Sequence, residues 1–455
     1  MDCNATVFKK FNVFLLCIAQ CVIYGYLAYF TTRTQFVELI VLVIFVFLSS
    51  LYIVKTGSLS FKQLIGLSII FRLIFLLSIP QLSQDFFRFY WDGQLILSGL
   101  NPYLHTVDYF FDLNEVDFVA QAEILKQGMG SLNAGNYSNY PPFSQFLYAV
   151  SSWIANNSIL AFIIALRLFL TIFDLLLIVY ARKILNYLSF NKDLIFLYVL
   201  NPLCILETTG NLHLEGVMIS LFVISIYFLI KNKIVLSALF LGLSIGTKLL
   251  SLIALPLIIV YLFKHYKLKW LKPIFLFLVS VAFILILQFI PFFNYSFINN
   301  FYESIGLWFV KFEFNASIYY LIRWLGFQIY GYNIIQTYGV VMPILTIVLF
   351  LIFILKTKSL KSVLENFLWM LTIYFLLSTT VHPWYILFPL SLSVILNYRF
   401  GLLWSILGFL SYHAYASDVF KEDYTIIALE YILLLGFIFF EIFREKCPFK
   451  ISKRI

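Results

Sequence analysis

Two acids and an arginine stand at helical spacing near residue 90. Asp85, Arg88 and Asp92 occupy positions i, i+3 and i+7, which an α-helix brings to one face. A carboxylate there can accept the proton of an attacking hydroxyl group, and an arginine can hold a phosphate leaving group through two hydrogen bonds. The pattern indicates group transfer to a hydroxyl, with Asp85 or Asp92 as the base. It also fits a helix whose i, i+3 ion pair is only structural.

A second polar run occupies residues 207–216, between two apolar segments. Its imidazole and carboxylate, His213 and Glu215, could contact a polar substrate where the helices break. Lys248 stands at the tip of a tight hairpin, and a lone lysine at a membrane boundary suits an anionic headgroup. The alternatives are a polar interhelical turn for the run and simple snorkelling for the lysine.

Two aromatic strings complete the candidate substrate-binding set. Tyr140 opens the string Tyr140-Pro141-Pro142, and the string at residues 381–385 lies between two late apolar segments. In that second string, His382 and Trp384 could bind a sugar by hydrogen bonds and stacking. The same residue types are typical of the aromatic belt at a membrane surface.

The composition determines which elements must position these side chains. The chain has 455 residues, of which 62% are hydrophobic and 12% are charged. About 282 apolar residues, at roughly 20 for each bilayer-crossing helix, would supply about 14 spans. A soluble protein has roughly 25% charged residues, so a soluble enzyme, a disordered chain and a nucleic-acid-binding module are excluded. We expect an all-α integral membrane helical bundle of about 11–14 spans, with residues 1–455 as one transmembrane domain and the lipid bilayer as its partner.

The basic residues set the expected orientation. Of the 31 Lys and Arg residues, 22 stand at the ends of apolar segments, and one threading places all 22 on one side. The positive-inside rule makes that side the cytoplasm, so both termini are expected there and residues 81–143 and 294–332 outside. The spans are expected near residues 11–30, 36–54, 63–80, 158–181, 193–209, 212–230, 234–247, 249–263, 273–293, 333–355, 363–380, 383–397, 400–416 and 424–443.

Three charged residues fall inside these spans: Arg72, Arg167 and Asp174. A charge at a helix centre costs roughly 2.5–3.5 kcal/mol on insertion scales, so each needs a partner or a function. Because Arg72 and Asp174 fall at similar depth, we predict a structural ion pair between them rather than a proton path.

The outside loop of residues 81–143 is expected to form interfacial helices. Residues 85–98 predict an amphipathic helix that Ser83 caps and Gly99 ends. Its apolar side would hold it in the plane of the membrane surface, and residues 143–155 could form a second helix of this kind.

Taken in order, these strings resemble the GT-C superfamily of glycosyltransferases, closest to the bacterial polytopic mannosyltransferase-like group that uses polyprenyl-phosphate sugars. The loop supplies Asp-x-x-Arg from Asp85, then Trp-Asp-Gly, Asn-Pro-Tyr and Tyr-Pro-Pro. Further matches are Gly-Asn-x-His-x-Glu-Gly at 210–216, Gly-x-x-x-Gly-Thr-Lys at 242–248 and His-Pro-Trp-Tyr at 382–385. The resemblance covers residues 72–389.

This resemblance implies an active site under the first large loop, a polyprenyl-phosphate sugar donor and inversion at the anomeric carbon. The general base maps onto Asp85 and the phosphate-holding arginine onto Arg88, while Asp92 is a second acid that competes for the role of base. Some relatives need a divalent metal. The five cysteines show no metal-ligand spacing, and the sequence indicates no required cofactor.

The expected function is transfer of a hexose from a polyprenyl-phosphate donor to a glycan or lipid acceptor outside the cytoplasm. By the resemblance, the hexose is mannose and the location is a bacterial inner membrane. The candidate catalytic residues are Asp85 and Asp92. The candidate substrate-binding residues are Arg88, Tyr140, His213, Glu215, Lys248, His382 and Trp384. The main alternative is a lipid-linked sugar flippase or other transporter, which would show broken helices in two related halves. A glycan polymerase or ligase usually carries its large loop late in the chain, whereas the longest loop here comes early.

Overall fold

The protein is a polytopic helical membrane protein. The computed structural model describes residues 3–417 and 419–446, and their regular structure is helical apart from one isolated β-bridge between Phe314 and Thr380. Within these residues, eight helices are long and apolar enough to cross a membrane, or nine if one bent pair counts as a span. Three shorter apolar helices accompany them. The expected all-α membrane fold is therefore confirmed.

The observed helices lie within a few residues of most expected segments, but only eight or nine of the described ones, rather than 11–14, are long and apolar enough to cross a membrane. The long ones are α1 (Cys3–Tyr29), α2 (Phe36–Thr56), α8 (Ile159–Tyr187), α13 (Leu255–Tyr266) together with the preceding 3-10 turn η3 (Leu249–Ala254), α14 (Leu271–Phe289), α17 (Ile335–Lys356), α18 (Leu360–Leu377) and α21 (Tyr424–Lys446). The three shorter ones are α11 (Glu215–Ile230), α12 (Ile234–Thr247) and α19 (Leu387–Leu396), which continues the 3-10 turn η6 (Pro383–Ile386). The segment expected near 400–416 forms α20 (Phe400–Leu407), which runs into η7 (Gly408–Tyr415). The terminal residues 1–2 and 447–455 lie outside the described residues.

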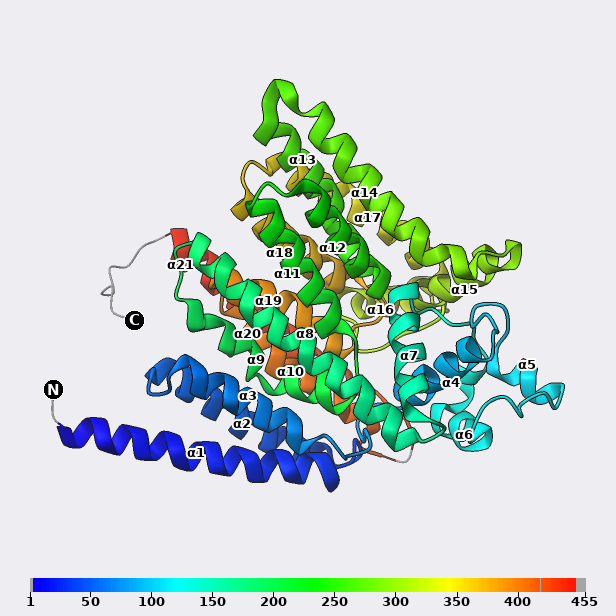
Figure 1. Cartoon of the computed structure of the whole chain (residues 1–455), viewed down its shortest axis with the longest axis horizontal. Coiled ribbons are helices and arrows are strands. Elements are labelled where there is room, and N and C mark those ends of the chain that lie inside the picture. The colour runs from blue at the N-terminus through cyan, green and yellow to red at the C-terminus, as the bar shows by residue number, and fades with distance from the viewer. Residues whose placement is uncertain (1–2, 418, 447–455) are drawn as a thin grey trace.

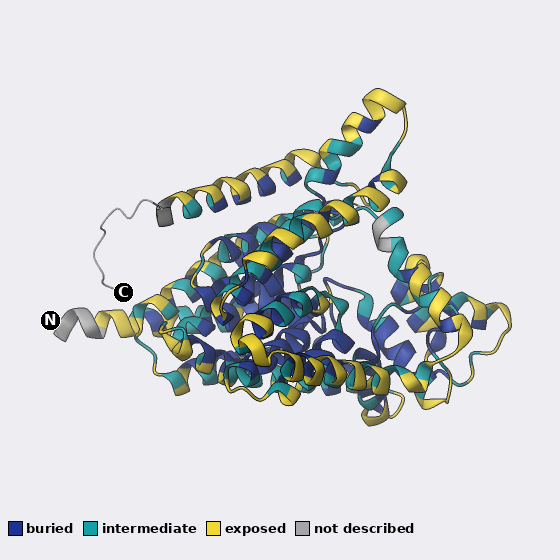
Figure 2. Ribbon diagram, turned by 90° about the horizontal axis from the view of Figure 1, so that it is seen from above, coloured by how far each residue is buried: buried dark blue, intermediate teal, exposed yellow. Residues whose placement is uncertain are grey.

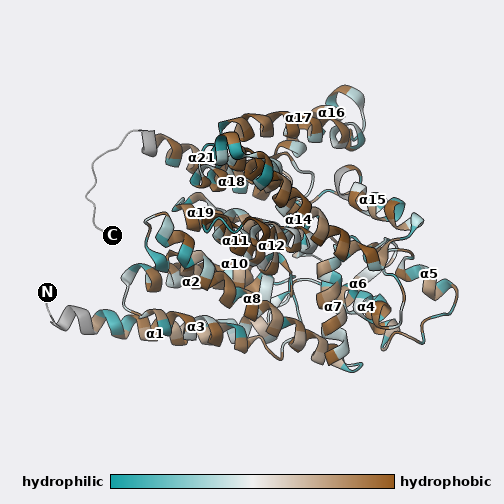
Figure 3. Ribbon diagram, turned by 45° about the horizontal axis from the view of Figure 1, so that its top comes forward, coloured by the Kyte–Doolittle hydropathy of each residue, from teal (hydrophilic) through white to brown (hydrophobic). Residues whose placement is uncertain are grey.

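Outward-facing surfaces of the helices are apolar. In Figure 2 the outer helices turn exposed residues away from a buried centre, and in Figure 3 most of those helices are coloured as hydrophobic. On α17, for example, Val340 and Leu355 are 63% and 72% exposed. Large exposed apolar faces of this kind are what contact with lipid requires.

The span expected near 63–80 is shorter than predicted, and a buried arginine explains why. Helix α3 (Phe61–Ile74) has 14 residues, about 21 Å of helix against a hydrocarbon core of roughly 30 Å. Just beyond its end, the guanidinium of Arg167 donates to the backbone carbonyls of Phe75, Leu76 and Ser78. Because these carbonyls have a side-chain donor, the backbone can leave the helix without an unsatisfied group.

The predicted ion pair between Arg72 and Asp174 is confirmed. Arg72 Nε lies 2.8 Å from Asp174 Oδ2, and both side chains are 1% exposed. Arg72 also donates to Ser68 Oγ at 2.8 Å and to the Val199 carbonyl at 3.3 Å. These contacts compensate for removing the two charges from water and tie α3 to α8.

The chain from Asp85 to Ala155 folds into four helices, whose apolar residues share a core with α8 and α11. They are α4 (Asp85–Leu97), α5 (Val107–Asp112), α6 (Ala122–Ala134) and α7 (Pro142–Ala155). In Figure 1, α4–α6 lie at the end of the molecule away from the start of α1 and the end of α21. Apolar residues of α4 and α7 pack together with those of α8, including Phe89, Tyr148 and Phe162.

Helix α4 differs from the expected surface helix, because it is buried on both faces. Its charged residues Arg88 and Asp92 are as inaccessible as Phe86 and Phe89. The approach to α7 is so close that a Cβ on Gly93 would lie 2.5 Å from the Tyr148 carbonyl oxygen. The N-cap is Gln84 rather than Ser83, although Ser83 Oγ accepts a hydrogen bond from the Asp85 amide at 3.3 Å. Gly99 ends the helix with a φ of 76°, as expected.

The segment of residues 294–332 contacts the loop of residues 81–143 through its first helix. It contains α15 (Tyr295–Val310) and α16 (Ile318–Tyr330). From α15, Asn300 Nδ2 donates to the Tyr103 carbonyl at 3.0 Å, and Ser304 Oγ donates to the Tyr137 carbonyl at 2.9 Å. These hydrogen bonds join α15 to the loop of residues 81–143.

Removing one partner of the buried ion pair should destabilise the fold. We expect Asp174→Ala to lower the free energy of unfolding by about 3–5 kcal/mol, because Arg72 would stay buried without a counter-ion. Thermal unfolding in mild detergent measures the loss. Glu365→Gln is the control, since Glu365 pairs with Lys361 at 3.2 Å on the surface and such pairs contribute up to about 1 kcal/mol. Equal unfolding temperatures for wild type and Asp174→Ala would contradict this account.

Candidate active site

A broken helix supplies the polar centre of the candidate site. The segments Lys192–Val199 and Pro202–Gly210 meet at an angle of 55°. Asn201 bridges the break: its Oδ1 accepts from the Leu203 amide at 2.9 Å and its Nδ2 donates to Ser405 Oγ at 2.8 Å. The second segment ends as a π-helix, η2 (Ile205–Gly210). The chain then turns into α11, which begins at Glu215.

His213 lies between two carboxylates at the end of this break. Its Nδ1 is 3.1 Å from Glu207 Oε2, and its Nε2 is 3.6 Å from Asp85 Oδ2. His213 and Glu207 are almost completely buried, whereas the Asp85 side chain is 24% exposed. The structure thus joins the loop acid at the start of α4 to the broken helix, as an ion pair somewhat longer than a hydrogen bond.

The surroundings of His213 and Asp85 favour the charged form of both side chains. Burial disfavours the imidazolium of His213, but its contacts with Asp85 and Glu207 and the charge of Glu215 outweigh burial and raise its pKa to about 9. Burial likewise opposes ionisation of Asp85. The close polar contact with His213 and its charge, followed by weaker effects of His382 and Lys248, lower the Asp85 pKa below its usual value. At neutral pH, Asp85 is a carboxylate next to a cation.

Glu215 and Lys248 form a second charged pair beside the first. Lys248 Nζ lies 2.6 Å from Glu215 Oε1, with the lysine side chain 21% exposed and the glutamate 2% exposed. The second carboxylate oxygen of Glu215, Oε2, is buried without a hydrogen-bond partner. A buried acceptor of this kind is costly unless a ligand or water satisfies it. The pair therefore offers a cation and a free acceptor to a ligand.

Trp384 lies between two imidazole rings. Its ring centroid is 3.9 Å from that of His213 and 4.3 Å from that of His382, and the second pair is stacked at 5°. Burial lowers the pKa of His382 to about 3, so this ring is neutral at pH 7. The β-bridge between Phe314 and Thr380 fixes the segment that carries His382, and the Phe314 ring stacks on His382 at 4.7 Å.

These groups border a cavity of about 560 Å³. One end is polar and includes Asp85, Asn139, Tyr140, Glu215, Lys248, Thr380, Trp384 and Tyr385. The other end is apolar and lies among η3, α13, α17 and α18. Leu252 and Ile347 border it while being 45% and 61% exposed, so the cavity reaches the outer surface of the bundle. Its volume is within the range of small-molecule sites, roughly 300–1,000 Å³.

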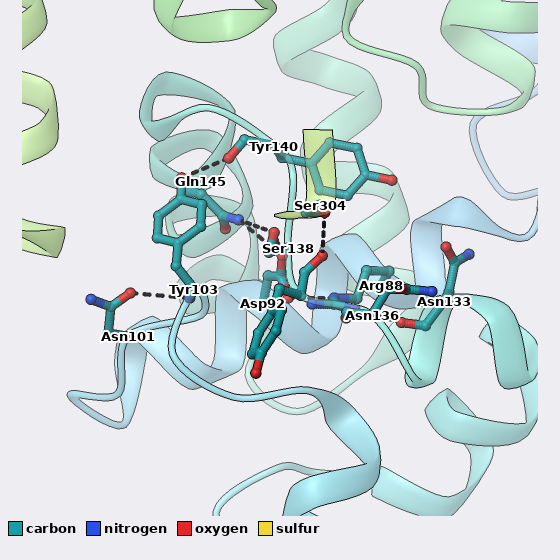
Figure 4. A network of polar contacts seen from close by, with 11 residues as sticks. Arg88, Asp92, Asn101, Tyr103, Asn133, Asn136, Ser138, Tyr140, Gln145 and Ser304 are labelled. Carbon is teal, nitrogen blue, oxygen red and sulfur yellow. Dashed lines mark hydrogen bonds and ion pairs between the residues drawn. The ribbon is translucent and has the colours of Figure 1, made fainter. Parts of the chain in front are cut away.

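Arg88 and Asp92 form a network separate from this cavity. Arg88 Nε is 2.7 Å from Asp92 Oδ1, and Arg88 Nη1 donates to the carbonyls of Asn133 and Asn136. Asp92 Oδ2 accepts from Ser138 and Gln145 (Figure 4). Among the described residues, neither Arg88 nor Asp92 lines the cavity. The arginine thus pairs at i+4 with Asp92, not at i−3 with Asp85, and the pair holds the loop together.

The structure brings most of the sequence-predicted site residues together. Asp85, Tyr140, Glu215, Lys248 and Trp384 line one cavity. Outside the lining, His382 stacks on Trp384 and His213 lies against it at a tilt. Their roles stay predictions. Sequence reasoning did not select Glu207 or the apolar wall of α17. Glu207 stood in the polar run, and its spacing from Asn211 and His213 was the available signal.

No group of three or more His, Cys, Asp or Glu side chains in the described part of the chain is arranged to hold a metal ion.

The chemistry open to the candidate site follows from the residues around the cavity. It offers a partly exposed carboxylate, a cation within reach of the cavity and a free carboxylate acceptor, next to an apolar channel. These groups suit proton removal from a hydroxyl and binding of an anionic lipid headgroup.

Comparison with known proteins places the chain in a family. Residues 14–264, more than half of the chain, match the model described as alpha-(1->6)-mannopyranosyltransferase, N-terminal domain. The chain is also 22% identical over 338 residues to alpha-(1->6)-mannopyranosyltransferase A of Mycobacterium tuberculosis. The aligned region covers 70% of this chain and 62% of that protein. The family match includes Asp85, His213 and Lys248. The chain therefore belongs to the alpha-(1->6)-mannopyranosyltransferase family, as defined by its N-terminal domain.

Proposed function

We propose that the protein is a membrane mannosyltransferase that moves mannose from a polyprenyl-phosphate donor to a glycan or lipid acceptor outside the cytoplasm. The observation that carries this proposal is the cavity, which joins a charged end containing Asp85 to an apolar end at the lipid-facing surface. A donor with a sugar, a phosphate and a long hydrocarbon chain has the same division of polarity. Family membership supports mannose as the sugar.

The apolar end fits the hydrocarbon chain of the donor. Its wall on α17 consists of Tyr338, Gly339, Met342, Pro343, Thr346, Ile347 and Phe350, which share one helical face. From 339 to 350 this face extends for roughly 16 Å along the helix axis, about half of a hydrocarbon core of roughly 30 Å. Leu252 and Ile253 of η3 border the same space. A prenyl chain could therefore enter sideways from the bilayer.

At the charged end, each group has a role in displacement at the anomeric carbon. Asp85 accepts the proton of the acceptor hydroxyl, whose oxygen forms the new bond to C1 of mannose. The bond from C1 to the phosphate oxygen breaks, and polyprenyl phosphate leaves with that electron pair. Lys248 lies where it can neutralise the leaving phosphate, and Glu215 Oε2 can accept a hydrogen bond from a sugar hydroxyl. An in-line displacement of this kind inverts the anomeric centre.

We assign the phosphate contact to Lys248 in preference to Arg88. Arg88 is buried, and its Nε and Nη1 already donate to Asp92 and to two carbonyls. Moving it into the cavity would leave Asp92 as an uncompensated buried charge. We assign the base to Asp85 rather than Asp92, because Asp85 lines the cavity whereas Asp92 is buried outside it and paired with Arg88.

The membrane orientation supports an extracytoplasmic reaction. Most Lys and Arg residues stand at helix ends on the side opposite α4–α6, among them Lys55, Lys183, Lys231 and Lys356. By the positive-inside rule that side is the cytoplasm, which puts Asp85 outside. A bacterial inner membrane is the proposed location.

The direct test is an assay of the purified protein with a panel of polyprenyl-phosphate sugars, which detects the polyprenyl phosphate released. Release with the mannosyl donor in the presence of an acceptor supports the proposal. A flippase would instead move the lipid-linked sugar across vesicles without releasing polyprenyl phosphate, and that result would refute transfer.

Loss of the proposed base should abolish most of the transfer. We expect Asp85→Asn to lower kcat by about 10²–10⁴, since an amide cannot accept the hydroxyl proton and general-base catalysis contributes about this much. Asp108→Asn is the matched control, because Asp108 lies in the same loop in a surface pair with Lys126 at 2.9 Å. Near-normal kcat for Asp85→Asn in correctly inserted protein would rule Asp85 out as the base.

Filling the apolar end should discriminate between donors by chain length. We expect Thr346→Trp to raise the donor KM at least about tenfold for a long polyprenyl chain, about 1.4 kcal/mol of binding free energy, and to leave a short prenyl donor unaffected. The control is Ile344→Trp, because Ile344 is 61% exposed on the same helix and does not line the cavity. Equal KM changes for both donors would show that the hydrocarbon chain binds elsewhere.

A further inference from the structure

We propose that Glu207 is a positioning residue for the transfer reaction: its carboxylate keeps His213 in the imidazolium form, and the imidazolium holds Asp85 at the cavity. This inference rests on the function proposed above. Glu207 itself does not belong to the cavity lining in the described part of the chain, so any effect on the reaction passes through His213.

The Glu207 carboxylate has three polar partners in the described residues: Tyr412, Asn211 and His213. Its Oε1 accepts from the Tyr412 hydroxyl at 2.7 Å, and its Oε2 accepts from Asn211 Nδ2 at 2.9 Å and faces His213 Nδ1 at 3.1 Å. The residue is completely buried in the π-helix η2. Buried carboxylates are costly unless they are paired, and π-helical turns occur frequently at functional sites. The arrangement fixes a carboxylate against Nδ1, at one edge of the imidazole ring.

The geometry determines how His213 is protonated. A carboxylate can only accept, so His213 Nδ1 must carry a hydrogen toward Glu207. A neutral ring would then direct the Nε2 lone pair toward the Asp85 carboxylate, which is repulsive. A second proton on Nε2 makes both contacts attractive. The ring between two carboxylates is therefore an imidazolium, in agreement with its raised pKa of about 9.

The other charged groups around the ring do not replace Glu207. Glu215, on α11, adds negative charge but is paired with Lys248 at 2.6 Å. From η6, His382 is neutral at pH 7 because burial lowers its pKa to about 3. From η7, Tyr412 contacts Glu207 rather than the ring. Asp85 and Glu207 are thus the two carboxylates in direct contact with His213 in the described residues.

Replacing Glu207 by glutamine should introduce a new titration into the reaction. With one carboxylate removed, we expect the His213 pKa to fall from about 9 toward its ordinary value of about 6.5. About 3% of the ring would then stay protonated at about pH 8, so kcat should fall about thirtyfold between about pH 5.5 and pH 8. Wild-type kcat should stay level over this range, and the donor KM of both proteins should differ by less than about threefold.

Two variants separate this role from a merely structural one. Tyr412→Phe removes a hydrogen bond to Glu207 but keeps the charge, and Glu207→Asp keeps the charge on a shorter side chain. Both should retain the level wild-type pH profile, even where kcat is lower. A structural defect would lower kcat equally at each pH. A level profile for Glu207→Gln would overturn the proposal.

A measurement without turnover keeps this inference distinct from the proposed function. The chain has five histidines, and ¹⁵N NMR of histidine-labelled protein can assign the His213 signal through its loss in His213→Gln. We expect an imidazolium in wild type at about pH 7.5 and a neutral ring in Glu207→Gln. A neutral His213 in wild type would overturn the inference, including where Glu207→Gln does not fold. If no lipid-phosphate sugar is turned over while His213 is an imidazolium, the proposed function fails and the effect of Glu207 on His213 stands.

Discussion

The contact of His213 with two carboxylates is the interaction on which the candidate site depends. It joins the first outside loop to the broken helix, because Asp85 begins α4 and Glu207 belongs to η2. Two anions and one cation in a mostly buried place remain stable only when each charge has its partners. This condition explains why the surrounding polar groups, such as Tyr412 and Asn211, are directed at Glu207.

Interrupted helices make this arrangement possible inside a membrane protein. A continuous helix satisfies its own backbone and offers only side chains, whereas a break exposes backbone groups that need partners. Here the side-chain oxygen of Asn201 accepts from the Leu203 amide at one break. Arg167 donates to carbonyls at the ends of α3 and η2, including those of Phe75 and Thr209. Arg167 is thus a buried cation whose described partners are backbone carbonyls. The breaks place Glu215 in the polar lining of the cavity and His213 just behind it, against Trp384 and Asp85.

The loop needs its own rigidity to present Asp85. Arg88 and Asp92 supply it by joining α4 to the segment 133–145 through carbonyls and side chains. Asp85 and Asp92, which look equivalent in the sequence, therefore differ in role. Asp85 keeps partial exposure at the cavity, whereas Asp92 is completely buried and satisfied by three partners. Their surroundings, not their residue type, distinguish a candidate base from a structural anion.

Sequence reasoning alone was sufficient to predict the all-α membrane fold, to place most helical segments within a few residues and to select Asp85, Glu215, Lys248 and Trp384 as site candidates. Hydrophobic length, charge placement and helix breakers are local properties, so they can be recognised without coordinates. The pair Arg72–Asp174 was also predictable, because two unpaired charges in lipid need one another.

Only the tertiary structure decided which groups meet. Arg88 stands three residues from one acid and four from the other, and local spacing permits either pair. Ser138 and Gln145 settle the choice by donating to Asp92. Likewise, Glu207 became a neighbour of Asp85 through His213, and α17 became the wall of an apolar channel. Contacts between distant segments depend on the packing of the whole bundle, because a side chain's partners there are set by helix position and burial rather than by sequence periodicity.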